Sequence, residues 1–111
     1  MKECTSKNPV NITLKVLGGK WKPLILWYLN QKTLRFSELS KEIVGITQKM
    51  LTQQLRELEE DGLVSRKIYP EVPPKVEYSI TEYGQTLEPV LDALAKWGKR
   101  HESRGSGEGS Q

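Results

Sequence analysis

The residues best suited to chemistry lie between Gly45 and Gly62, in the run GITQKMLTQQLRELEEDG. Five polar side chains recur there at i, i+1, i+4, i+5 and i+8, and this spacing places them on one side of a helix: Gln48, Lys49, Thr52, Gln53 and Arg56. A glutamine amide matches the donor and acceptor of adenine, an arginine fork matches guanine, and lysine and threonine reach bases or phosphates. The stripe predicts a surface that reads a nucleic-acid groove, with a solvated polar face as the alternative.

The same run carries signals for both ends of a helix. Thr47 is a good N-cap, and Ile46 before it can form a hydrophobic staple with Leu51. Gly62 can take the left-handed conformation that often ends a helix. Three leucines at i, i+4 and i+7 predict a buried stripe opposite the polar one: Leu51, Leu55 and Leu58. Acidic residues occur only near the C-terminal end of the run, so the N-terminal two-thirds could enter a groove without meeting its phosphates with anions.

Length and composition suit one soluble domain. The chain has 111 residues, of which 36% are hydrophobic and 28% charged, enough for a real core. No apolar run is long enough for a membrane span, no signal peptide is recognisable, and the single cysteine cannot form an internal disulfide. We therefore expect a cytoplasmic protein with no membrane partner.

Positive charge is concentrated in the first part of the chain. The net charge is +3 and the pI about 9.0, which alone would justify little. Residues 1–46, however, hold eight Lys and Arg against three Asp and Glu. A basic front half next to a polar helix is compatible with a polyanion partner.

Two helices precede this region. Pro9 suits the first turn of a helix that ends at Gly18-Gly19, after polar residues 1–8 that we expect to form a flexible arm. Its apolar face comprises Val10, Leu14 and Leu17. A second helix, from Lys20 to about Leu29, is apolar nearly all round, which predicts a central helix buried on several sides.

A helix-turn-helix and a wing follow. Leu34 to Phe36 is long enough only for a single edge strand. Ser37 is expected to cap a helix that ends at Val44, with Leu39, Ile43 and Val44 inward; the Gly-containing turn and the Thr47 helix complete the motif. Residues 63–69 and 75–81 are strand candidates, and the prolines between them stiffen the hairpin tip.

The last helix is expected to start after Thr81 and to extend to about residue 102, with Pro89 causing a kink near Leu87-Glu88 or two abutting segments. Its apolar face is larger than one hairpin and one short helix can cover, so a second copy of the chain is the expected cover. This face comprises Tyr83, Leu87, Val90, Leu91, Leu94 and Trp97. The Gly- and Ser-rich residues 103–111 predict a disordered tail, and residues 9–102 the folded domain.

Four separated motifs carry a resemblance to a known family: GGKW at 18–21, RFSEL at 35–39, LTQQLRELEEDGLV at 51–64 and VPPKVEYSIT at 72–81. With these motifs in this order, the chain resembles HxlR-type transcriptional regulators, in the MarR-like winged helix-turn-helix group. The resemblance implies an α+β, mainly α fold with N- and C-terminal dimerisation helices. It also implies a homodimer that binds double-stranded DNA at a palindromic operator, as a repressor or activator.

Carried onto this chain, the resemblance makes the Thr47 to Asp61 helix the one that enters the major groove, with the five polar residues above as its contacts. Lys75 at the wing would contact the neighbouring minor groove or backbone. Arg35, Ser37 and Lys41 would hold phosphates beside the first helix of the motif. We expect repression rather than activation.

Cys4 is the candidate for effector sensing. Many members of the family have an N-terminal cysteine that senses oxidants, quinones or aldehydes, so the resemblance implies a response to a small molecule or electrophile. Lys2 and Lys7 could lower the pKa of the Cys4 thiol. Here the cysteine is further from Gly18-Gly19 than expected, and Thr5 replaces the usual proline, so an inert thiol is the alternative.

The residue types argue against an enzyme and against a cofactor. There is no Gly-rich phosphate loop and no metal-spaced set of Cys and His, and His101 is the single histidine. The functional alternative to a DNA-binding regulator is a winged-helix module whose polar helix binds another protein. The steep salt dependence expected of DNA binding would distinguish the two.

Overall fold

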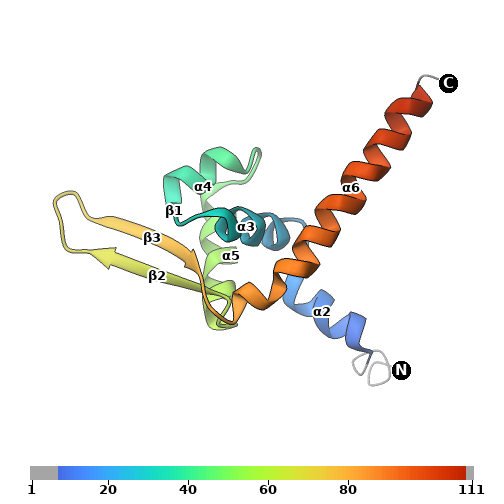
Figure 1. Ribbon diagram of the computed structural model, residues 1–111. Helices are drawn as coiled ribbons and strands as arrows, with labels where there is room; N and C mark the ends of the chain where they lie inside the picture. The colour runs from blue at the N-terminus through green and yellow to red at the C-terminus, as the bar shows by residue number, and fades with distance from the viewer. Residues whose placement is uncertain (1–7, 110–111) are drawn as a thin grey trace.

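The computed structural model describes residues 8–109, in which a helical body carries a small antiparallel sheet at one side, and the β2–β3 hairpin of this sheet projects away from the body (Figure 1). In chain order the elements are α2 (Pro9–Leu17), α3 (Trp21–Gln31), β1 (Leu34–Arg35), α4 (Phe36–Glu42), α5 (Gln48–Glu60), β2 (Val64–Tyr69), β3 (Lys75–Ile80), the 3-10 helix η1 (Gly84–Leu87) and α6 (Glu88–Gly109). The α+β, mainly α winged helix-turn-helix predicted from the sequence is confirmed.

α3 is the central helix, as its apolar sequence predicts. Ile25, Leu26 and Leu29 are buried, and α3 packs against α5, β3 and α6. Close packing around such a helix makes its side chains sensitive to changes in volume. The core around α3 also receives residues from α2, α4, the three strands and the loops between them. Its buried apolar residues are Leu17, Ile25, Leu26, Leu29, Leu34, Leu39, Ile43, Ile46, Leu51, Leu55, Leu58, Leu63, Val64, Tyr78 and Leu91.

The sheet has the strand order β1-β3-β2, with both pairs antiparallel. The short strand β1 pairs at the edge, with Leu34 opposite Tyr78. β2 and β3 pair from Val64 opposite Ile80 as far as Tyr69 opposite Lys75, where the proline-containing tip begins. The predicted hairpin is therefore present, and each strand is one residue shorter than expected.

The first helix of the motif differs from the prediction at both ends. α4 begins at Phe36 rather than being capped by Ser37, because Glu38 Oε1 accepts a 2.8 Å hydrogen bond from the backbone N–H of Arg35. It ends at Glu42, after which Gly45 adopts a positive φ of 93°. Val44, expected to face inward, is 87% exposed, whereas Ile43 is buried. Because the helix ends at Glu42, Ile43 points toward the core and Val44 points into solvent.

Asn8, the first residue that the structure describes, is the N-cap of α2. Asn8 Oδ1 accepts a 2.9 Å hydrogen bond from the N–H of Val10, which caps α2. On α2 only Leu17 is buried, and Val10, Ile12 and Leu14 are exposed. The helix therefore presents an apolar face that its own chain does not cover.

The C-terminal region contains the two abutting segments that Pro89 predicts: η1 is followed directly by α6. Thr81 does not start a regular α-helix; its hydroxyl accepts from the N–H of Gly84 (2.9 Å) and donates to the carbonyl of Gly62 (2.6 Å). α6 extends to Gly109, seven residues beyond residue 102, the predicted end of the folded domain. His101 consequently lies within the helix, where its ring stacks on Trp97 at a centroid distance of 4.9 Å.

Candidate nucleic-acid interface

The position of α5 is determined by its own caps and leucines. The hydroxyl of Thr47 accepts a 3.0 Å hydrogen bond from the N–H of Met50, and Gly62 has a φ of 76° just after the C-terminal end. These are the helix ends that the sequence predicts. Leu51, Leu55 and Leu58 are buried in the core. The opposite side of α5 must therefore face away from the body.

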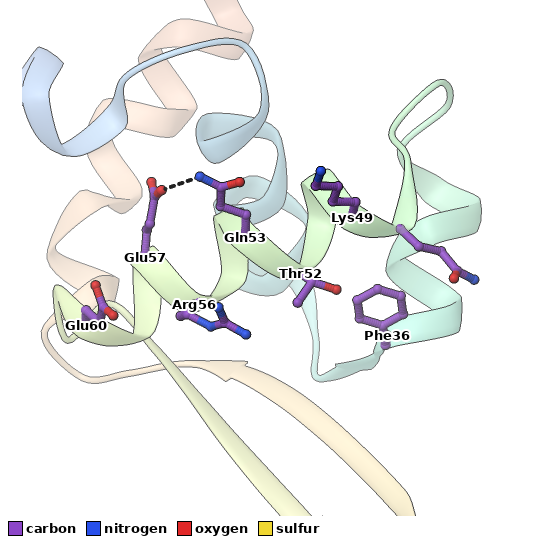
Figure 2. A pocket seen from close by; sticks show the side chains of 8 residues that line it. Phe36, Lys49, Thr52, Gln53, Arg56, Glu57 and Glu60 are labelled. Carbon is purple, nitrogen blue, oxygen red and sulfur yellow. Dashed lines mark hydrogen bonds between the residues drawn. The ribbon is translucent and has the colours of Figure 1, made fainter.

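All five predicted contact residues are exposed on that opposite side. Figure 2 shows Lys49, Gln53, Thr52 and Arg56 projecting from α5, with Phe36 of α4 beyond Thr52. Together they line an open hollow of about 720 Å³, which we call the α5 hollow: Phe36, Gln48, Lys49, Thr52, Gln53, Arg56, Glu57 and Glu60. The tertiary structure thus brings the whole stripe together and packs none of it into the core.

One acidic residue of the hollow is tied to the body of the protein. Glu57 Oε1 lies 2.6 Å from the ammonium of Lys22 on α3, and Glu57 Oε2 accepts a 3.3 Å hydrogen bond from Gln53 Nε2. The hydrogen bond from Lys22 lowers the pKa of the Glu57 carboxyl below its ordinary value, and the bond from Gln53 and the charge of Lys22 act in the same direction. Glu57 is therefore ionised at neutral pH and neutralised by Lys22.

The other predicted contacts do not line the hollow. Arg35, Ser37 and Lys41 are exposed on α4 and at its start, next to Phe36 in the chain. Since Phe36 is part of the α5 hollow, this end of α4 borders the polar face of α5. Lys41 is on the last turn of the helix.

Lys75 is at the base of the wing tip, and its ammonium has partners within the wing. It lies 4.4 Å from the ring centre of Tyr69 and 3.8 Å from Glu77 Oε2. Glu77 also accepts a 3.0 Å hydrogen bond from the Tyr69 hydroxyl. Arg66, on the neighbouring strand β2, lies 3.7 Å from Glu59 Oε1 instead of pairing with Glu77. Tyr69 lies opposite Lys75, two residues before Glu77 on β3, so these three side chains gather at the end of the ladder.

Three residues of this region were not among those singled out from the sequence. Phe36 closes one end of the α5 hollow, and Lys67 on β2 lies 5.0 Å from the ring centre of Tyr69, as a second cation of the wing. Lys22 is buried and paired with Glu57. A single cation inside the apolar run WKPLILWYL was the available signal, because a buried lysine requires a partner.

The structure also bears on the cysteine, on metal binding and on membrane-spanning helices, within residues 8–109. Cys4 lies outside residues 8–109, so the structure does not place the candidate sensor. Within that range no group of three or more His, Cys, Asp or Glu side chains is arranged to hold a metal ion. None of the helices in the described part is both long and apolar enough to cross a membrane.

A capped recognition-type helix, a preceding helix across a glycine turn and a following β-hairpin define the class of winged helix-turn-helix transcription regulators. Residues 16–106 match the family described as HxlR-like helix-turn-helix, and the chain belongs to this family. It is a transcriptional regulator of the helix-turn-helix type, in the MarR-like group, and such proteins are not enzymes.

Similar proteins agree with this assignment. An HTH-type transcriptional regulator of Methanothermobacter thermautotrophicus is 50% identical over 102 residues, covering 92% of this chain and 78% of that protein. The crystal structure of the HTH-type regulator YtcD superposes with a TM-score of 0.82 at 55% identity, covering 87% of this chain and 99% of that one. The redox regulator HypR in its oxidised form superposes with a TM-score of 0.80 at 51% identity, covering 83% and 95%.

Proposed function

We propose that this regulator binds double-stranded DNA sequence-specifically as a homodimer, with α5 in the major groove. The observation that carries the proposal is the exposed polar side of α5, opposite three buried leucines. Gln48, Lys49, Thr52, Gln53 and Arg56 are its base and phosphate contacts. Arg35, Ser37 and Lys41 contact phosphates beside α4, and Lys75 contacts the backbone or minor groove at the wing.

Dimerisation through α2 and α6 is supported by apolar surface that one chain leaves uncovered. Both helices project from the side of the body opposite the hairpin (Figure 1). On α6, Leu94 is 51% exposed and Trp97 60%. A groove of about 330 Å³ between α3 and α6 is lined by Pro23, Leu24, Trp27, Tyr28, Leu91, Leu94 and Ala95. Apolar surface on this scale is rare on a monomer.

Two-fold symmetry leads to the palindromic operator. A symmetric dimer presents two copies of α5, and these read successive major grooves about 34–36 Å apart. Covering promoter DNA in this way represses transcription. The first experiment is selection of duplexes from a random pool by the purified protein. A palindrome with half-sites one helical turn apart is expected, and enrichment of no sequence would contradict the proposal.

The assignment of individual readers is tested on the selected duplex. Arg56→Ala and Gln53→Ala should each cost about 1–3 kcal/mol of binding free energy and relax the preference at one base position. Lys75→Ala should weaken binding to all sequences alike. Lys99→Ala is the matched control, because Lys99 is an exposed cation on α6. If the first two variants behave like Lys75→Ala, then Arg56 and Gln53 are not the readers.

Recognition of a protein instead of DNA is the competing function, since the same polar helix could bind an acidic partner. Protein binding would not show the counterion release of a duplex. An affinity for the selected duplex that does not depend on salt would therefore favour the protein-binding module.

We further infer that the regulator responds to oxidants or electrophiles through Cys4. Support comes from the likeness to HypR, which is named a redox regulator, and from the presence of a single cysteine in the chain. Alkylation of the thiol should change the affinity for the selected duplex in the natural protein but not in Cys4→Ser. Unchanged affinity after alkylation would remove Cys4 from the mechanism.

A further inference from the structure

We infer that Lys22 and Glu57 are positioning residues that orient the side-chain amide of Gln53 for reading an adenine. The inference rests on the proposed DNA binding and adds to it the base that Gln53 selects. It also assigns a role in recognition to a residue of α3, a helix that lines no part of the α5 hollow.

The first link joins the core to the reading helix. Lys22 is only 9% exposed, and its ammonium lies 2.6 Å from Glu57 Oε1. A lysine buried to this extent is nearly always paired, because an unpaired charge would lose its hydration without compensation. The stem of Lys22 is held by the packing of α3 against α5. The carboxylate of Glu57 is thereby held in one place at the edge of the α5 hollow.

The second link fixes the polarity of the amide. The other oxygen of Glu57, Oε2, lies 3.3 Å from Gln53 Nε2 (Figure 2). An ionised carboxylate only accepts hydrogen bonds, so the NH₂ group of Gln53, and not its carbonyl, must face Glu57. One N–H is used in this bond. The second N–H and the carbonyl oxygen remain available, and Gln53 is exposed.

An oriented amide of this kind matches one base. Adenine presents N7 as an acceptor and its N6 amino group as a donor in the major groove, which pair with the N–H and the C=O of a glutamine. A glutamine that is free to flip its amide must be ordered when it binds, and that ordering costs conformational entropy. Because Lys22 neutralises Glu57, the hydrogen-bonded Glu57 carboxylate repels the DNA phosphates less than an unpaired carboxylate would.

The α5 hollow also contains a matched control. Glu60 lies one turn further along α5 and lines the same hollow, but it has no hydrogen bond or ion pair within the described residues. Glu60→Gln and Glu57→Gln therefore remove the same charge from the same surface. Only Glu57→Gln removes the fixed acceptor for Gln53, since an amide at position 57 can donate as well as accept.

The experiment is selection from a random duplex pool with the natural protein and four variants: Gln53→Ala, Glu57→Gln, Glu60→Gln and Lys22→Met. Gln53→Ala identifies the base position that Gln53 reads, and adenine is expected there in the natural protein. At that position Glu57→Gln and Lys22→Met should reduce the preference for adenine by about 5- to 150-fold, the range that one bidentate contact supplies. Base preferences at the other positions of the site should stay unchanged. If Lys22 and Glu57 had a purely structural role, their loss would weaken the preferences at all positions instead. Glu60→Gln should leave all preferences as they are.

Three results would overturn the inference while leaving DNA binding intact. These are a position read by Gln53 that is not adenine, no change of its preference in Glu57→Gln, or an equal change in Glu60→Gln. Should Lys22→Met fail to fold, Glu57→Gln decides alone, because its amide oxygen still accepts from Lys22. Failure of the natural protein to select any duplex would instead refute the proposed function.

Discussion

Removal of one cation from the proposed interface should change the salt dependence of DNA binding by a calculable amount. Apart from Arg56, assigned to a base, the interface has four cations per protomer: Arg35, Lys41, Lys49 and Lys75. A dimer would then neutralise about eight phosphates, which gives a slope of log K against log [salt] of about −7. Affinity for the selected duplex should fall roughly 10⁴-fold between about 50 and 200 mM salt.

Lys41→Ala is the sharpest variant for this test, because Lys41 is exposed and the structure records no ion pair for it within residues 8–109. It removes two contacts per dimer, so the slope should flatten to about −5.5 and the loss between the two salt concentrations to roughly 10³-fold. Fluorescence anisotropy of a labelled duplex over a salt series measures both quantities. Lys99→Ala should keep the natural slope.

A slope shallower than about −2 for the natural protein would refute the counting, since it would correspond to contact with only two phosphates. An equal flattening in Lys99→Ala would refute the assignment of the interface to α4, α5 and the wing. It would indicate instead that net charge alone governs the interaction.

Three further perturbations test the fold and the assembly. A Cβ on Gly84 would meet the carbonyl oxygen of Leu63 and lie 2.7 Å from Ile80 Cγ1. Gly84→Ala should therefore lower the free energy of unfolding, measured in urea, by about 1–3 kcal/mol. Gly98→Ala, where a Cβ meets nothing within 4 Å, should be neutral or stabilising by up to about 1 kcal/mol, and a reversed order would contradict the packing at Gly84. Because folding lowers the pKa of Glu57, its contribution to stability is present above its unfolded-state pKa and is lost as pH falls through the folded-state pKa. Glu57→Gln should therefore be less stable than the natural protein at about pH 7, and the difference in unfolding free energy should shrink as the pH falls through the folded-state pKa; a pH-independent difference would contradict this. Leu94→Glu should weaken the dimer more than about 100-fold, since symmetry places the buried charge twice in the interface; a dimeric mass in sedimentation at low micromolar concentration would refute the α6 interface.

The sequence by itself determined the elements that depend on local patterns. Thr47 and Gly62 marked the ends of α5, and the leucine period identified its buried side, because caps and helical periodicity involve residues one to four positions apart. The same locality made the polar stripe recognisable as one surface. Pro89 likewise indicated either a kink or two abutting segments, and the structure has two segments, η1 and α6.

Only the tertiary structure decided the interactions between distant segments. The pairing of Lys22 with Glu57 depends on how α3 crosses α5, and the partners of Glu77 depend on the register of β2 and β3. Val44 could not be assigned to solvent from its type, because the exact residue at which α4 ends decides which apolar side chain points inward. Local patterns specify elements and their faces, whereas the partner of each face is selected by packing among all elements at once, and no single stretch of sequence contains that information.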